Sequence, residues 1–217
     1  MSLSQPNKIR SAEHNFTRTA LIWGGLIAII AIALFFTAMS PLIAWRSPVY
    51  IAACFAGVIG LALLLLQPLL IGGFLPGLPK HLSRRMHPRI GVLLMICVIV
   101  HVGGLWLTSP PDVIDALTFS SPTPFSNWGV IAMWSLLATT GLALFRRRLK
   151  LRAQNWSKAH RFFALVIVIG TIVHALLIEG MMETVSKLTL CVLVFAVTIK
   201  LIFGSKFWTN FRSKLKQ

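Results

Sequence analysis

The sequence predicts an all-α integral membrane protein, a bundle of six transmembrane helices with both termini on the cytoplasmic side. Of its 217 residues, 56% are hydrophobic and only 12% are charged, which is typical of a chain that lies in a bilayer. A spanning helix needs about 20 mostly apolar residues, and six stretches meet that length. They cover roughly 19–39, 49–71, 87–107, 127–145, 160–178 and 186–204.

These stretches predict the domain organisation. Residues 1–18 form an N-terminal cytoplasmic tail, 19–204 a six-helix transmembrane domain, and 205–217 a basic cytoplasmic C-terminal tail. The first stretch is longer than the apolar core of a signal peptide and further spans follow it. We therefore interpret it as an uncleaved anchor.

The start of the third helix is set by a proline. The residue before a proline is disfavoured in the helical region, and proline suits the first helical position. We therefore expect this helix to begin at Pro88, with His87 at its edge. His81 falls in the preceding Gly/Pro-rich loop and is an alternative to His87 as a metal ligand. His14 lies in a polar tail and is interpreted as a solvated group.

The distribution of basic residues predicts the orientation. The formal net charge is +16, and all but two of the 21 basic residues lie in the N-terminal tail, the second and fourth connections, and the C-terminal tail. The exceptions, Arg46 and Lys187, fall in the other set of loops, which holds four of the five acids. By the positive-inside rule both termini are cytoplasmic, and an even number of spans agrees with this. A nucleic-acid binder would need a basic surface on a water-soluble fold, so we exclude that class.

Two of the spans carry histidines at the same spacing. "HPRIGVLLMICVIVH" runs from His87 to His101 and "HRFFALVIVIGTIVH" from His160 to His174. Fourteen helical steps amount to about 21 Å and bring the second side chain to within about 40° of the first. If the two helices face each other, His87 lies opposite His160 near the cytoplasmic side and His101 opposite His174 near the outer side.

Histidines that converge in pairs from opposite sides are the axial arrangement of a six-coordinate heme iron. A histidine in a membrane helix also serves as a hydrogen-bonding partner for a neighbouring helix, but two pairs at one spacing favour heme ligation. A single zinc site is excluded, because the two levels are about 21 Å apart and zinc–nitrogen bonds are about 2 Å long.

Basic residues at the inner level suit the anionic propionates of a heme. Contact with lipid headgroups is an equally good interpretation for each of them. The residues are Arg84, Arg85, Arg89, Lys158 and Arg161.

With these residues the sequence resembles the ferric reductase-like transmembrane domain, which is shared by ferric reductases, NADPH oxidases and the heme-binding membrane subunit of a bacterial methionine sulfoxide reductase system. The four histidines carry the resemblance, together with "RRMHPRIG" and "WSKAHRFF", and it extends over almost the whole chain. It implies two b-type hemes that pass electrons from the cytoplasmic to the outer side of a membrane, which we expect to be the bacterial inner membrane.

The resemblance leaves the donor and the acceptor open. The chain has no GxGxxG and no Walker-type loop, so we expect a separate flavoprotein, with FMN or FAD on that partner or loosely bound, or membrane quinol as the donor. The basic connection "RRRLKLRAQNWSK" suits docking of the flavoprotein. An acceptor protein, oxygen or a ferric chelate would react at the outer side, and no catalytic residue is identified in this chain.

Two alternatives remain. One is a non-redox six-span transporter or membrane assembly subunit, whose histidines bind each other, a proton or a metal. The other is the cytochrome b subunit of a quinol-linked enzyme or an ascorbate-type transmembrane cytochrome. Absorption spectra distinguish the transporter or assembly subunit from a cytochrome. The identity of the reductant distinguishes a quinol-linked cytochrome from one that a flavoprotein reduces.

Overall fold

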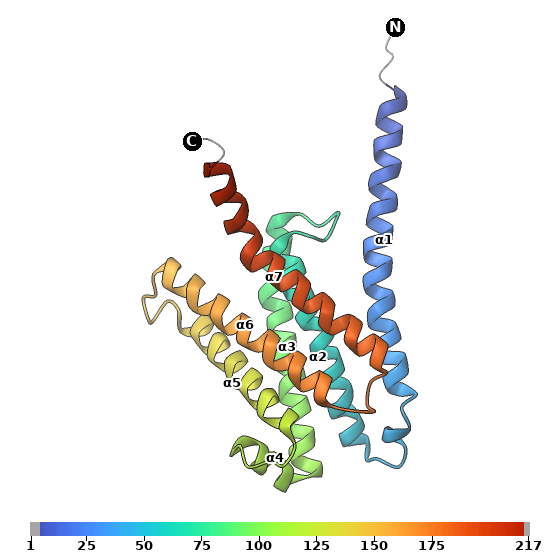
Figure 1. Cartoon of the computed structure of the whole chain (residues 1–217), viewed down its shortest axis with the longest axis vertical. Coiled ribbons are helices and arrows are strands. Elements are labelled where there is room, and N and C mark those ends of the chain that lie inside the picture. The colour runs from blue at the N-terminus through green and yellow to red at the C-terminus, as the bar shows by residue number, and fades with distance from the viewer. Residues whose placement is uncertain (1–4, 215–217) are drawn as a thin grey trace.

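Six long helices build the protein (Figure 1). The computed structural model describes the backbone of residues 5–214 and the side chains of 16–204, so that His14 and the ends of both tails lie outside the described side chains. The long helices are α1 (Gln5–Ala38), α2 (Pro48–Gly72), α3 (Lys80–Thr108), α5 (Pro124–Phe145), α6 (Ala153–Leu177) and α7 (Thr184–Lys214). Each contains a segment long and apolar enough to cross a membrane, and no strand occurs in the described backbone. The predicted six-span all-α membrane bundle is confirmed.

Two helical hairpins form the centre of the bundle. α2 packs along α3, and α5 packs along α6, whereas α3 and α5 touch only briefly. α7 crosses the bundle and contacts both α2 and α6, and α1 stands at the edge against α2 and α7 (Figure 1). The most deeply buried side chains include Leu65 of α2 and Leu190 and Val194 of α7, so the apolar core lies where α7 crosses the first hairpin.

Polar contacts at both ends attach α1 to the bundle. The Trp23 indole N–H donates to the carbonyl of Pro76 over 3.0 Å, and the Ser40 hydroxyl, just beyond α1, donates to the carbonyl of Gly180 over 2.8 Å. α1 begins and α7 ends at the same end of the bundle, opposite the short helix α4 (Pro110–Leu117) (Figure 1). The described parts of the proposed tails 1–18 and 205–217 continue α1 and α7 as helix.

Two expectations about the third helix are wrong. α3 begins at Lys80, so Pro88 lies inside it, His87 is helical, and His81 belongs to its first turn instead of a loop. A proline inside a helix removes one backbone N–H donor. Pro88 and Arg84, whose carbonyl would have accepted that bond, are both exposed. The freed carbonyl can therefore find another partner, and the helix continues through the proline.

The connection between α3 and α5, which lies between two predicted spans, contains helix α4. Pro110 stands at its first position, and Asp112 in its first turn accepts a hydrogen bond from the Ser109 hydroxyl over 2.5 Å. Val113 is buried. α4 therefore packs its apolar side against the adjoining ends of α3 and α5.

Candidate functional site

The structure brings the four histidines together in the two pairs that the spacing predicted. The ring centroids of His87 and His160 lie 6.0 Å apart at an interplanar angle of 81°. Those of His101 and His174 lie 6.3 Å apart at 82°. Each pair joins α3 of one hairpin to α6 of the other, so both pairs lie across the seam between the hairpins.

Backbone carbonyls fix the outer pair. Nδ1 of His101 lies 2.8 Å from the carbonyl oxygen of Ala53, and Nδ1 of His174 lies 2.8 Å from that of Phe125. A carbonyl only accepts hydrogen bonds, so in each neutral ring Nδ1 carries the proton and Nε2 keeps a free lone pair. Two acceptor nitrogens cannot bond to each other, whereas both can bind one metal ion. A backbone acceptor on the second ring nitrogen is the usual support of a metal-binding histidine.

A glycine makes room for each outer imidazole. Gly57 follows Ala53 by one helical turn, and Gly129 follows Phe125 in the same way. A Cβ atom at Gly57 would lie 3.0 Å from Nδ1 of His101, and one at Gly129 would lie 2.7 Å from Nδ1 of His174. Both rings therefore lie against bare backbone, and a side chain at either glycine would displace them.

Sequence reasoning missed these four supporting residues. The only signal is a glycine four positions after the residue that supplies the carbonyl, in both α2 and α5. This spacing acquires a meaning only once α2 is known to pack on α3, and α5 on α6.

The inner pair has different surroundings. Nδ1 of His160 lies 3.1 Å from the Thr139 hydroxyl oxygen. Nδ1 of His87 is buried with no hydrogen-bond partner in the described structure. The Trp156 ring stacks on His160 with centroids 5.2 Å apart, and the Arg146 guanidinium lies 5.6 Å from the Trp156 ring centre. The inner imidazoles are therefore less tightly held than the outer ones, and an aromatic stack links one of them to the basic α5–α6 connection.

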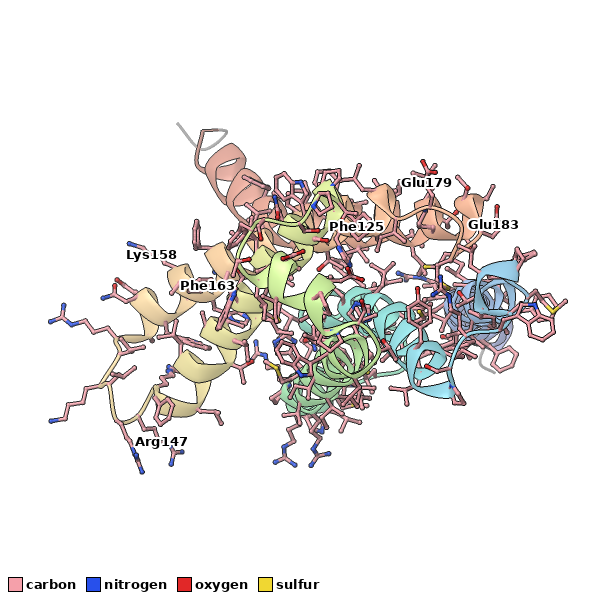
Figure 2. All side chains as sticks on the ribbon, turned by 90° about the horizontal axis from the view of Figure 1, so that it is seen from below. Phe125, Arg147, Lys158, Phe163, Glu179 and Glu183 are labelled. Carbon is pink, nitrogen blue, oxygen red and sulfur yellow. The ribbon has the colours of Figure 1, made fainter. Side chains whose placement is uncertain are left out.

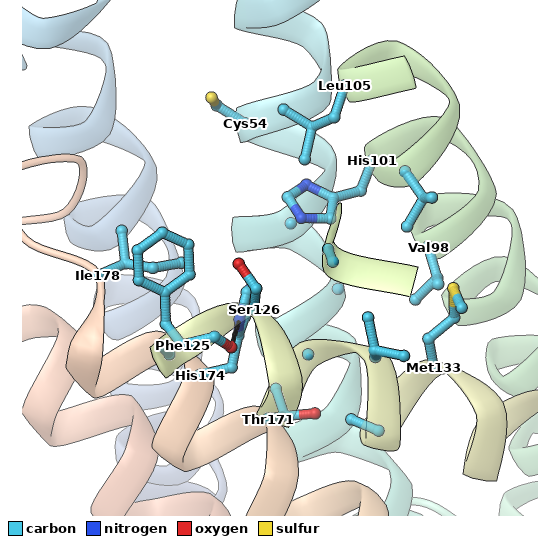
Figure 3. Close-up of a pocket in the computed structure, with 18 of the residues that line it drawn as sticks. Cys54, Val98, His101, Leu105, Phe125, Ser126, Met133, Thr171, His174 and Ile178 are labelled. Atoms are coloured by element: carbon cyan, nitrogen blue, oxygen red, sulfur yellow. Dashed lines mark hydrogen bonds between the residues drawn. The ribbon is translucent and has the colours of Figure 1, made fainter. Parts of the chain in front are cut away.

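A cavity of about 530 Å³ opens at the outer pair, within the range of about 300–1,000 Å³ common for ligand pockets. Figure 3 shows His101 of α3 and His174 of α6 in its wall, with Phe125 beside His174. The lining also includes Gly57, Gly129 and, toward α4, Asp112 and Asp115. Lys187 of α7 completes the wall.

The donor set fits a heme iron. Two metal–nitrogen bonds of about 2 Å, together with half the width of each ring, put the centroids of two axial imidazoles about 6 Å apart. Both observed separations agree with this distance. The described residues contain no group of three or more His, Cys, Asp or Glu side chains that could hold a metal alone. A pair of imidazoles suits an ion whose other ligands come from a macrocycle.

The basic residues assigned to propionates remain a prediction. Arg84, Arg85 and Arg89 of α3 and Arg161 of α6 are all exposed. Figure 2 shows the neighbouring Arg147 and Lys158 side chains reaching away from the bundle around the α5–α6 connection. This end of the molecule thus presents a cationic surface.

The fold and the site define a class: a multi-pass membrane protein with two facing imidazole pairs between its central hairpins. The chain belongs to the family described as ferric reductase like transmembrane component, whose model matches residues 55–171. The match runs from α2 into α6, includes His87, His101 and His160, and ends before His174. Membership supports a role in membrane redox chemistry and electron transfer. No curated protein and no solved structure matches the chain.

Proposed function

We propose that the protein is a transmembrane b-type cytochrome that carries electrons across the membrane through two bis-histidine hemes. The observation that carries this proposal is the outer pair, in which both Nδ1 protons are committed to backbone carbonyls and both Nε2 atoms are free to bind iron. A heme bound there supplies reversible one-electron chemistry.

The chain's own residues would supply position and insulation. His101 and His174 would hold the outer iron, and His87 and His160 the inner one. The apolar faces of the two hairpins would keep water from both centres. Arg84, Arg85, Arg89 and Arg161 would meet the propionates of the inner heme.

The charges support an orientation in the membrane, and the family resemblance supplies the direction of electron transfer. All described basic residues except Arg46 and Lys187 lie at the end where α1 begins and α7 ends or close to it. This end would be cytoplasmic by the positive-inside rule, in the bacterial inner membrane. The donor would bind there, either as a flavoprotein reductase that carries FMN or FAD or as a quinol. The acceptor would react near α4. It would be a partner protein, oxygen or a ferric chelate.

Purification tests the proposal directly. The protein should be red, with a low-spin bis-histidine spectrum and two hemes per chain by the pyridine hemochrome assay. A folded, colourless preparation would contradict it and would favour the transporter or assembly class.

A second experiment identifies the donor. The oxidised protein is mixed either with a flavin reductase, NADH and FMN, or with a reduced quinol, and the heme bands are followed with time. We expect reduction by the flavin system. Reduction by quinol alone would overturn the flavoprotein-fed version and assign the protein to the quinol-linked cytochromes.

A further inference from the structure

Lys187 is a buried cation at the outer end of the bundle. It lies near the start of α7, and its side chain is only 6% exposed. Its ammonium group donates a hydrogen bond to the carbonyl oxygen of Ile178 over 2.6 Å. Ile178 directly follows α6, whose last turn contains His174. The ammonium group is thereby held at the end of α6 that carries His174.

Within the described structure this charge has no carboxylate partner. An ammonium group has three N–H donors, and the bond to Ile178 uses one. Of the nearby acids, Asp112 accepts from Ser109, and Glu183 accepts from the backbone N–H groups of Val185 and Ser186. Asp115 also lines the cavity, but the described structure has no ion pair between it and Lys187. Burial of an unpaired charge is costly, so a buried ammonium normally meets an anion.

Lys187 also faces the candidate heme site. It lines the same cavity as His101 and His174, and no other lysine or arginine contributes to the described wall. The second outer cation, Arg46, is exposed and stacks on the Tyr50 ring at 4.9 Å. Among the described lysines and arginines, only Lys187 is therefore placed to bind an anionic group inside the cavity.

We propose that Lys187 binds a propionate carboxylate of the outer heme and so positions the macrocycle between His101 and His174. This inference rests on the function proposed above. The ammonium group would also stabilise the reduced iron, because reduction removes one positive charge from the centre.

Redox titration of the full-length protein tests this role. The variants are Lys187→Gln, Lys187→Arg and, as the matched control, Arg46→Gln; a His160→Ala background isolates the outer heme. We expect Lys187→Gln to shift the ratio of oxidised to reduced outer heme about tenfold toward the oxidised form at a fixed potential, which is about 59 mV for a one-electron couple. Lys187→Arg should stay close to the wild type, and Arg46→Gln should have no effect.

A second arm removes the propionate charge from the cofactor instead. Protein produced without heme is reconstituted with hemin or with hemin dimethyl ester, and both are titrated. In the His160→Ala background, the outer site of the protein with Lys187 should bind the ester more weakly than hemin, because the ester offers no carboxylate to the ammonium group. Lys187→Gln should bind hemin and the ester with the same affinity. The wild-type comparison still decides the question if Lys187→Gln does not fold.

Two outcomes would overturn the inference while the cytochrome assignment stands. One is an equal loss of outer-heme affinity in Lys187→Gln with hemin and with its ester. The other is an unchanged potential combined with slower oxidation of the reduced protein by ferric citrate, which would assign Lys187 to an anionic acceptor. Wild-type protein that binds no heme in either form would instead refute the proposed function itself.

Discussion

The imidazole of His174 lies against the backbone of Gly129, where a Cβ atom would come within 2.7 Å of Nδ1. The same ring is held by the carbonyl of Phe125, one turn earlier on α5. Helix α5 therefore offers both an acceptor and an empty surface to one ring. The packing of α5 on α6 decides how this histidine faces the opposite hairpin.

Gly129→Ala should cost the protein its outer heme. The added methyl group displaces His174 and breaks its bond to Phe125, and loss of such support typically lowers metal affinity about 10- to 100-fold. The hemochrome assay should then find one heme per chain instead of two. Gly141→Ala, in the same helix but with nothing within 4 Å of the new methyl group, should keep both. Two hemes in Gly129→Ala would show that the ring does not need this surface.

Replacement of the histidines should remove the hemes one at a time. His101→Ala or His174→Ala should eliminate the outer heme and preserve most of the inner spectrum, because the two pairs share no ligand. His160→Ala should do the reverse. Low-temperature absorption spectra and heme counts provide the measurement. Retention of both hemes in all three variants would refute the ligand assignment.

Thr139→Val should alter the inner heme alone. Valine keeps the shape of this buried side chain but removes the hydroxyl that lies 3.1 Å from Nδ1 of His160. Loss of such a contact should weaken inner-heme retention about 10- to 100-fold, and the inner potential should change. Thr139→Ser keeps the hydroxyl and serves as the matched control. A change confined to the outer heme would contradict this placement.

The stability that the start of α7 gives the protein should depend on pH through Glu183. Its carboxylate accepts from the backbone N–H groups of Val185 and Ser186, both over 2.7 Å, and these bonds lower its pKa below the ordinary value of 4.5. The contribution to stability is therefore complete above that ordinary value and disappears as the pH falls through the lowered pKa of the folded state. Thermal unfolding should show the wild type to be more stable than Glu183→Gln at pH 7, with the difference closing in acid.

Glu179→Gln provides the control for that experiment, because Glu179 lies in the same connection with an exposed side chain. The difference in thermal stability between Glu179→Gln and the wild type should not change with pH in this way. A Glu183→Gln difference that stays constant down to pH 3 would mean that the carboxylate does not cap α7.

The spans and the histidine pairs could be predicted from the sequence because both depend on local patterns. Apolar runs of sufficient length identify the helices, and the fourteen-residue spacing places both histidines of a helix on one face. The start of α3 could not be predicted, because the preference against helix before Pro88 is weaker than the packing of α3 on α2.

The supports of the outer imidazoles could not be predicted either. Ala53 and Phe125 act through backbone carbonyls, which every residue has, and Gly57 and Gly129 act through the lack of a side chain. Their importance depends on which helices are neighbours. The role proposed for Lys187 likewise required its burial beside the cavity, since the sequence shows only a cation in an acidic loop.

The limited contact between α3 and α5 has a consequence for biogenesis. Each hairpin packs mainly within itself, so the insertion machinery could deliver the two hairpins to the membrane separately. One histidine of each pair arrives with the first hairpin and the other only after α6 has been synthesised. Binding of the proposed hemes would therefore require both hairpins to have docked, and in a cell short of porphyrin the two hairpins would lack the heme irons proposed to link them.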